Sequence, residues 1–550
     1  MEVAIHRFEA QYRLAPPTAV AQRRLDQLST EVLSRAFQIA VEHEGIDDAA
    51  EVCMRSLFAQ VRLRLDTADE AIVSSWGAAL AAEIRRVLRH GPTTNVAVYH
   101  SRRQALVDMA LGVARGDRSR AWAWRQLGLW TAGQTSTEIA VSELVKALQR
   151  NPAMVVATLR AIAQLGCLNL LAARLTAVHW QELARAALFE FRGVTSVEPG
   201  ESGPSPRAVR AARNVLKRSS VLNAIILEGP PQMDAARAVA ALAILDVDPG
   251  LVRSDAAASV IDLIADAVCA AKVEARDGLR ATDSEETRFP SQRRLTTEQA
   301  ARDRDNNLIR AAEQRLRGPE DSRAGRKQFG SPSLSKETIA AELSQTETGR
   351  RVADYSSRTQ RTDVSRASSA QQRSDKEAAL VDLRRRAISR YGGLLFLIAV
   401  IEALDLTTQI LNGEVLGSRP LAWTLHQLAL VLAPVEPHDP AALAFAGLPP
   451  DIKWPFAGEP PLEQHEALEL KALAGQIESH LSSVVELDEL TEVSAFQFVI
   501  HRRTEIVAEP GWIEARFSLE DVATEIRRAA LDLNPGFVPW LGVVIMFVYE

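Results

Sequence analysis

The sequence has few of the residues that form disulfides, metal sites or catalytic centres. Among its 550 residues are only three cysteines, Cys53, Cys167 and Cys269, which lie far apart among apolar neighbours. Because there is no C-x-x-C pair, we interpret them as small core residues. The ten histidines are scattered, with no H-E-x-x-H motif, and G-x-S-x-G is absent. The sequence therefore predicts no catalytic, cofactor-binding or metal-binding residues, and we do not expect an enzyme.

Partial matches to known motifs do not change this prediction. The stretch "LEGPPQMDAA" (227–236) lacks the second glycine and the lysine that a triphosphate-binding loop needs. Ser333 and Lys336 form S-x-x-K, but in a polar stretch that cannot hold a nucleophile or exclude water. Glu285 and Glu286 belong to a solvated run rather than to an apolar pocket. Single histidines beside apolar residues are interpreted as structural groups rather than ligands: His100, His179, His426 and His501.

No apolar run is long enough to span a membrane, which needs about 20 residues. The longest candidate, 536–549, is shorter and contains Pro539 and Gly542. Its final part, "VVIMFVY", is rich in β-branched and aromatic residues and predicts a buried strand covered on both faces. The first residues carry acid, base and histidine where a signal peptide would be apolar, so we expect synthesis in the cytoplasm.

The overall charge points to no particular partner. The formal net charge is −6 and the pI is near 6.0, so no obligatory nucleic acid or anionic membrane partner is expected. A hydrophobic content of 47% with 24% charged residues is ordinary for globular protein. At this length the chain is expected to fold as two or more domains.

The composition changes along the chain and predicts a mainly α fold with small α+β modules at both ends. The central segment has few apolar residues and more Arg and Lys than Asp and Glu, which predicts a long disordered or partly helical linker. The expected parts are an α+β module (β-α-β-α) over 1–100, an all-α region over 101–275, a polar charged linker over 276–386, a helical region over 387–490, and an α+β module (β-β-α-β) over 491–550.

Local patterns place the elements of the first module. Residues 3–14 predict a strand closed by two prolines, followed by a helix from Thr18. The clearest alternation in the chain, over 57–65, predicts a second strand. A second helix is indicated by an apolar stripe at helical spacing: Ile72, Trp76, Leu80, Ile84 and Val87.

Capping and turn signals mark elements further on. Ser101 is expected to cap a helix, and "NPAM" predicts another with Asn151 as cap and Gly166 at its exit. Near the end, 496–509 and 512–519 are expected to be strands joined by a type II turn at 510–511. A capping box from Ser518 to Asp521 predicts a helix with inward Val522, Ile526 and Leu533.

The two end modules each need partners for their strands. We expect them to form two similar sheets or to share one, with the chain ends close together.

The segment "RSRAWAWRQLGLW" combines tryptophan with arginine and has two interpretations. It could stack bases and bind phosphates of single-stranded nucleic acid, or anchor one helix against another while its arginines reach solvent. The structural or protein-interface interpretation is favoured. The residues concerned are Trp122, Trp124, Trp130, Arg118, Arg120 and Arg125.

Several passages together resemble one family. They are "HRFEAQYRL", "RSLFAQVRLRL" with "WGAALAAEIRRVL", "YHSRRQALVDMALGVARGDRSRAWAW", "RYGGLLFLIAVIEAL", "DPAALAFAGLPP" and "IRRAALDLNPGFVPWLGVVIMFVYE". The chain resembles the contractile injection system tape measure proteins, which are encoded with extracellular, phage-tail-like particles. The resemblance implies a non-enzymatic structural or assembly component that binds tube, sheath or baseplate subunits and can be incorporated into a released particle.

The family name implies a ruler, and this sequence departs from that picture. One continuous helix of 550 residues would span on the order of 800 Å. Helices broken by glycine and proline, and strands at both ends, instead predict globular parts joined by a tether. Two alternatives stay open: a cytoplasmic helical scaffold or adaptor unrelated to injection particles, and an enzyme with no recognisable motif.

Overall fold

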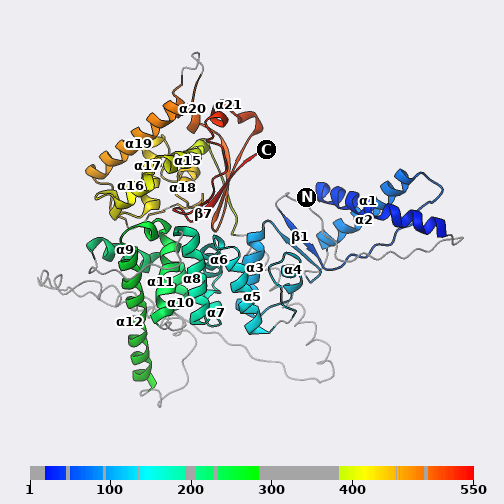
Figure 1. The fold of residues 1–550 in the computed structure, drawn as a ribbon, viewed down its shortest axis with the longest axis horizontal. Coiled ribbons are helices and arrows are strands. Elements are labelled where there is room, and N and C mark those ends of the chain that lie inside the picture. The colour runs from blue at the N-terminus through cyan, green and yellow to red at the C-terminus, as the bar shows by residue number, and fades with distance from the viewer. Residues whose placement is uncertain are drawn as a thin grey trace, which may run out of the picture. The chain divides into compact units, whose positions relative to one another are not determined.

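A computed structural model describes residues 19–44, 50–90, 94–133, 136–192, 205–226, 233–283, 383–453, 455–456, 459–487 and 493–550. The chain is mainly helical, as predicted, and its described strands form two separate sheets (Figure 1). The predicted strand over 3–14, the S-x-x-K motif at Ser333 and most of the predicted linker lie outside the described residues.

The N-terminal part contains α1 (Ala19–Glu44), β1 (Glu51–Met54), α2 (Asp69–His90) and β2 (Val96–Tyr99). Both predicted helices are confirmed, and the whole predicted stripe of α2 is buried. The strand predicted over 57–65 is wrong, because these residues form no strand and pair with no described strand. The sheet is instead the antiparallel ribbon β1–β2, in which Glu51 lies opposite Tyr99.

The predicted all-α region is helical throughout its described residues and ends later than the predicted boundary at 275. Its elements are α3 (Arg102–Arg115), α4 (Ala121–Gln126), α5 (Thr137–Gln149), α6 (Met154–Gln164), α7 (Leu168–Ala172), α8 (Ala177–Arg192), α9 (Pro206–Arg218), α10 (Ser220–Ile226), α11 (Met233–Val247), the 3₁₀ helix η1 (Pro249–Arg253) and α12 (Ala257–Asp283).

Two of the three predicted helix-end signals in this region are confirmed. The Ser101 hydroxyl accepts a hydrogen bond from the Gln104 N–H at the start of α3. Gly166 has φ 64° just after α6. The predicted cap at Asn151 is wrong, because α6 begins three residues later and the Asn151 amide donates to the Ala147 carbonyl at 2.8 Å.

The C-terminal domain comprises residues 383–550 and joins two parts that the sequence had separated at 490. Its elements are β3 (Arg385–Ser389), η3 (Gly392–Phe396), α15 (Leu397–Ala403), α16 (Leu406–Asn412), η4 (Leu416–Ser418), α17 (Leu421–Leu432), α18 (Pro440–Phe445), α19 (Gln464–Val484), α20 (Ala495–Ile500), β4 (Thr504–Glu509), β5 (Trp512–Phe517), η5 (Leu519–Asp521), α21 (Thr524–Arg528), β6 (Gly536–Val538) and β7 (Val543–Tyr549).

One sheet and one hydrophobic core hold this domain together. The strand order is β3-β4-β5-β7-β6, with β5 and β7 parallel and the other neighbours antiparallel. The core runs from Leu394 in η3 to Phe547 in β7. Strand β3 begins inside the predicted linker, so the boundary at 386 is corrected to 384 or earlier.

Predictions near the end of the chain are partly confirmed. Residues 495–500 are helix rather than strand, because Ser494 caps them and Phe496, Val499 and Ile500 are buried at helical spacing. Ser518 does cap a helix, but it is the short 3₁₀ helix η5. Of the residues expected inward, Ile526 is buried whereas Leu533 is 66% exposed.

The closing strand is confirmed as β7, although only one of its faces is fully buried. The turn before β5 is confirmed too, since Gly511 has φ 74°. The expectation of two similar sheets or one shared sheet is wrong for the described strands: one sheet is a two-stranded ribbon and the other a five-stranded mixed sheet.

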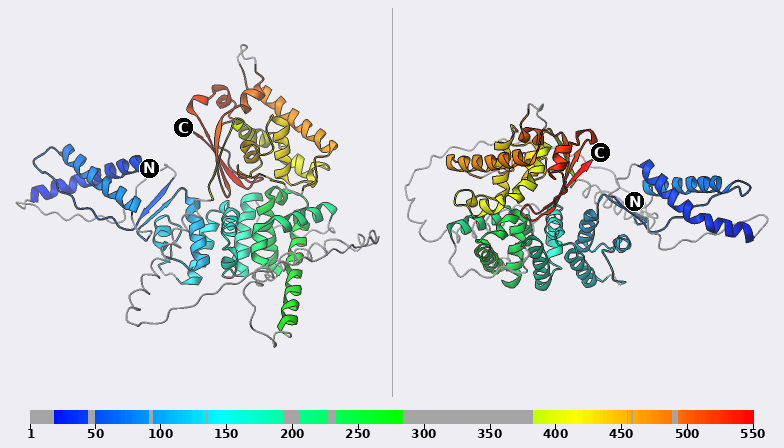
Figure 2. Two further views of the ribbon diagram at one scale, coloured as in Figure 1. Left: turned by 180° about the vertical axis from the view of Figure 1, so that it is seen from behind. Right: turned by 45° about the horizontal axis from the view of Figure 1, so that its top comes forward.

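The all-α region and the C-terminal domain pack directly on each other (Figure 2). A Cβ added to Gly511 would lie 2.4 Å from the Cβ of Ala157 in α6, so the β4–β5 turn can approach α6 because this residue is glycine. Phe191 of α8 meets Phe537 of β6 edge to face, with ring centroids 5.0 Å apart.

Candidate interaction sites

The tryptophan-rich segment is part of the core, which confirms the structural interpretation for two of its three tryptophans. Trp124 and Trp130 are buried and stacked, with ring centroids 5.9 Å apart. The Trp124 indole N–H donates to Asp108 at 3.1 Å, and that of Trp130 donates to the Ala132 carbonyl at 2.8 Å. Trp122 is half-buried. Rings fixed in this way offer no stacking platform for bases.

A buried carboxylate, Asp108 of α3, organises this region. Its Oδ2 accepts hydrogen bonds from Tyr99 of β2 at 2.9 Å and from Trp124 of α4, while Arg120 lies 3.5 Å from its Oδ1. Arg120 is buried, so the expectation that these arginines reach solvent is wrong for this one. Burial, with the Asp108 charge nearby, raises the pKa of Tyr99. The cluster therefore ties the β1–β2 ribbon to the all-α region.

Two of the three cysteines predicted to be core residues are buried, and so is His426, one of the histidines predicted to be structural. Cys53 and Cys167 are buried free thiols, and burial raises the pKa of Cys53 to about 12, which leaves it unreactive. His426 is buried, its Nε2 is 2.8 Å from the Pro437 carbonyl, and burial lowers its pKa. Cys269 is half-buried. Across the described ranges, no cluster of three or more His, Cys, Asp or Glu could hold a metal ion.

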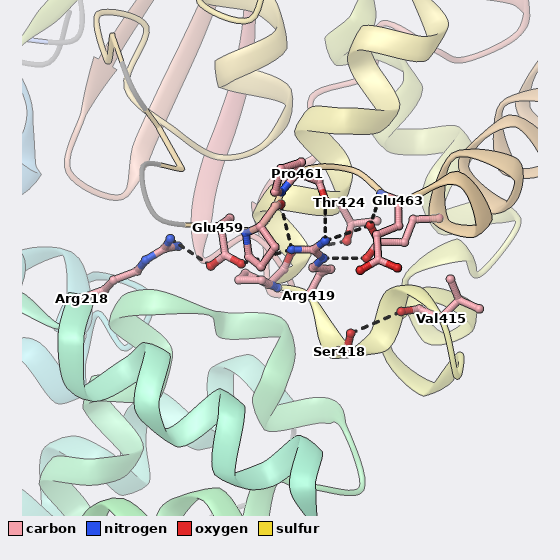
Figure 3. Close-up of polar contacts among 11 residues, drawn as sticks. Arg218, Val415, Ser418, Arg419, Thr424, Glu459, Pro461 and Glu463 are labelled. Carbon is pink, nitrogen blue, oxygen red and sulfur yellow. Dashed lines mark hydrogen bonds and ion pairs between the residues drawn. The ribbon is translucent and has the colours of Figure 1, made fainter. Parts of the chain in front are cut away.

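Arg419, two residues before α17, forms a polar cluster with Glu466 near the start of α19 (Figure 3). Arg419 donates to both carboxylate oxygens of Glu466, at 2.7 and 2.9 Å, and to the carbonyls of Pro460 and Pro461. Its guanidinium also lies over the Trp423 ring, 4.4 Å from the centroid. The Arg419 hydrogen bond lowers the pKa of Glu466, and the pKa of Arg419 is raised in return.

This cluster continues into the all-α region. Glu459 lies 3.7 Å from Arg419 through one oxygen and 3.0 Å from Arg218 of α9 through the other. The Arg419 and Glu466 side chains are only 6% and 5% exposed. Because each buried charge has an opposite charge beside it, the cluster acts as a cross-link between the two parts of the fold.

A second polar contact joins α3 to the β4–β5 hairpin. The Arg103 guanidinium lies 3.3 Å from the centroid of the Trp512 ring, and Arg103 is 3.7 Å from Glu509. Glu509 also faces Arg384, at 3.8 Å, and accepts a hydrogen bond from the Ser101 hydroxyl at 3.4 Å. Burial lowers the pKa of Arg103 to about 10. Ser101 thus caps α3 and contacts the sheet as well.

A third contact is made by a buried acid, Asp248, directly before η1. Its Oδ2 accepts a hydrogen bond from the Leu421 N–H at the start of α17, at 3.3 Å. Burial raises the pKa of Asp248 to about 6, although Arg207 nearby acts in the opposite sense. This carboxyl lies between the all-α region and the C-terminal domain, so its protonation bears on how they pack.

These three junctions were not found from the sequence. At the first junction Glu459 pairs with Arg218 of α9. At the other two, the partners are 173 residues apart for Asp248 and Leu421, and 408 for Ser101 and Glu509. No local spacing signals such pairs. All three hold the fold together, and none has the open, convergent polar groups of a catalytic pocket.

The remaining candidate is the N-terminal arm, which we define as residues 19–44 and 50–90. Leu25, Val32, Ile72 and Trp76 belong to a core of its own, and all members of this core that lie in described residues come from 25–88. The arm joins the rest through the β1–β2 ribbon, where Asn95 hydrogen-bonds the backbone of Ser56. A small, separate core of this kind suits a module that contacts another protein.

Among the described helices, no single one is long and apolar enough to cross a membrane. One bent pair, Gly392–Ala403 with Leu406–Asn412, passes by length and composition together, and its apolar residues are buried in the C-terminal core.

A comparison with known protein families found no match. Searches of curated proteins and of solved structures found no similar protein either.

Proposed function

We propose that this protein is a non-enzymatic assembly component of an extracellular contractile injection system, acting through contacts with tube, sheath or baseplate subunits. The proposal starts from the resemblance carried by passages at both ends and in the middle of the sequence. The single structural observation that supports it is the N-terminal arm, a helical module with a separate core. The buried charged groups at the junctions are engaged in contacts within the chain, which favours binding over catalysis.

A literal ruler does not fit the described helices. The longest, α12, has 27 residues and spans about 40 Å. The C-terminal domain and the all-α region are compact and share polar junctions. We therefore propose a globular assembly factor rather than an extended rod that measures the tube.

The test is co-purification of the tagged full-length protein from its native host, with mass spectrometry of the partners and negative-stain microscopy of the same fractions. We expect tube, sheath or baseplate proteins together with sheathed particles. An untagged strain is the control for particles that sediment or bind unspecifically. Recovery with soluble regulatory partners, or alone, would contradict the proposal and favour the scaffold or adaptor alternative.

A further inference from the structure

The five-stranded sheet of the C-terminal domain ends on one side in β3, which has a free edge. Strand β3 pairs with β4, and the strand order β3-β4-β5-β7-β6 puts no described strand on its other side. The opposite edge strand, β6, has only three residues, and its Phe537 packs on Phe191 of α8. With five residues, β3 is the longer of the two edges.

The hydrogen-bond pattern of the sheet shows which backbone groups of β3 point outward. The carbonyls of Gly511, just before β5, and of Phe517 accept hydrogen bonds at 2.9 Å from N–H groups in and just after β7. Odd-numbered residues of β5 therefore bond to β7, and even-numbered ones bond to β4. Glu514 lies opposite Val507 of β4, and Val507 lies opposite Arg386 of β3. Because Val507 bonds to β5, the N–H and C=O of Arg386 face away from the sheet.

The same alternation turns the N–H and C=O of Ile388 outward, since Ile388 lies opposite Glu505 of β4. On this outer side, neither Arg386 nor Ile388 has a backbone hydrogen-bond partner among the residues that the structure describes. Their side chains are accessible as well: Ile388 is 60% exposed, and the Arg386 side chain 53%. An extended edge with unpaired N–H and C=O groups is a template for a further strand.

The edge is strongly basic, although the chain as a whole carries a net charge of −6. Residues 384–390 contain four arginines and no acid. Arg390 and Arg503 follow the last ladder pair of β3 and β4, and both are exposed. Within the described ranges, neither has an ion-pair partner. Three arginines face carboxylates of the same chain at 3.1 to 3.8 Å: Arg384 with Glu509, Arg385 with Asp451, and Arg386 with Glu505.

This charge disfavours a second copy of the chain as the partner. If two β3 strands paired antiparallel about a twofold axis at Ile388, Arg386 would lie opposite Arg390 of the second copy. An axis at Ala387 would instead put Arg384 opposite Arg390. Like charges directly opposite each other destabilise a strand pair, whereas opposite charges stabilise it. The edge is therefore complementary to an acidic strand.

We propose that the free edge of β3 binds an extended acidic segment of another protein, which adds a strand to the sheet. The outward backbone groups of Arg386 and Ile388 supply the pairing, and the Ile388 side chain contacts alternate apolar residues of the partner. Arg390 and Arg503 receive its carboxylates. This inference does not rest on the proposed assembly role, because it is tested with purified protein alone.

The test is fluorescence anisotropy of a labelled synthetic peptide titrated with the full-length protein. The peptide has about eight residues, the length of an ordinary strand, in which glutamate alternates with valine. We expect saturable binding with a Kd below about 1 mM. A first control peptide is N-methylated at every residue, so it keeps the carboxylates but has no N–H with which to pair. A second control replaces each glutamate by lysine. Neither control should bind.

Two variants of the protein separate backbone pairing from charge. Ile388→Pro removes the outward N–H and should lower the affinity at least roughly fivefold. Because this N–H makes no bond to β4, the variant should fold, and its melting temperature checks this. Ile388→Thr is the matched control, since it keeps the N–H and a β-branched side chain, and it should bind more tightly than Ile388→Pro. Arg390→Glu combined with Arg503→Glu should lose the acidic peptide and gain the lysine peptide.

Four results would overturn the proposal. They are the absence of binding up to about 1 mM, equal binding of the N-methylated peptide, unchanged affinity in a folded Ile388→Pro, and unchanged peptide preference in the charge-reversed variant. Light scattering of the unliganded protein tests the remaining occupant. A molar mass that doubles with concentration, and does not double in Ile388→Pro, would identify a second copy of β3 as the partner and also overturn the proposal.

Discussion

Residues 57–65 in the N-terminal arm and strand β5 in the C-terminal domain have the same alternating sequence pattern but different structures. In β5, Ile513, Ala515 and Phe517 are fully buried, and the strand pairs with β4 on one side and β7 on the other. In 57–65 the inward residues are only half-buried and no described strand pairs with the backbone. Alternation therefore records which side chains face a core, whereas pairing depends on a second chain segment.

The largest effect of a substitution on stability is expected for the aromatic residues packed under the five-stranded sheet. Phe396 stacks on Phe517 and meets Phe547 edge to face, each with centroids 5.0 Å apart. We expect Phe396→Ala to lower the free energy of unfolding by about 3–5 kcal/mol, because it leaves a cavity in a closed core. Leu63→Ala in the arm should cost about 1 kcal/mol. Urea unfolding of both variants measures this, and equal losses would contradict the comparison.

Buried and exposed ion pairs should differ in the same way. Glu466→Gln leaves the buried Arg419 without its counter-charge and should cost about 3–5 kcal/mol. The matched control in the arm is Glu83→Gln, since Glu83 pairs with Arg86 on the surface of α2. An exposed pair of this kind is worth about 0.3–0.5 kcal/mol. Urea midpoints are the measurement. A double variant Arg419→Met, Glu466→Met should recover much of the loss, and an additive loss would show that the pair is not coupled.

Asp248 should make the junction between the all-α region and the C-terminal domain depend on pH. Its pKa is about 6 in the folded protein against an ordinary 3.8, so the folded state holds a proton that the unfolded chain releases. Its stabilising contribution is complete below about pH 4 and is lost as the pH rises through 6, by up to about 3 kcal/mol. Asp248→Asn should remove this slope and be the more stable protein at pH 7.5.

Melting temperatures at pH 4.5 and 7.5 test this expectation. The matched control is Asp262→Asn, at a partly exposed carboxylate of α12 that pairs with Arg237. If the melting temperature changes equally between the two pH values in Asp248→Asn and in the unchanged protein, Asp248 is ionised in the folded state.

The smallest effect is expected on the outward face of 57–65. Phe58→Ser removes a side chain that is 83% exposed and should change the free energy of unfolding by less than about 0.5 kcal/mol. Urea unfolding next to Leu63→Ala measures the difference between the two faces. A cost for Phe58→Ser above that of Leu63→Ala would mean that the outward face is covered.

Helix predictions succeeded where the signal is local. The stripe of α2 and the Ser101 cap were read correctly because helical contacts join residues three or four positions apart. Local reading failed at 496–500, where an apolar, aromatic run favoured a strand but Ser494 starts a helix. It also failed at Asn151, because α6 begins three residues later, at Met154.

The candidate sites could be predicted only in part. The structural role of Trp124 and Trp130 was predicted from the apolar residues that follow "WAW" in the sequence. The junctions at Arg419, Arg103 and Asp248 could not be predicted, because charged residues normally indicate surface and their burial depends on partners far along the chain. The predicted boundary at 490 is wrong because the core that joins both sides of it is formed by residues far apart in the chain.

The sequence by itself determined the helical class of the chain, the position of most helices, the apolar face of 57–65 and the closing strand β7. These follow from periodicity and backbone preference within a few residues. Only the tertiary structure decided the strand order, the union of the helices and strands of 383–550 in one domain, and the burial of paired charges. Those depend on which distant surfaces meet, and a contact across hundreds of residues leaves no spacing in the sequence.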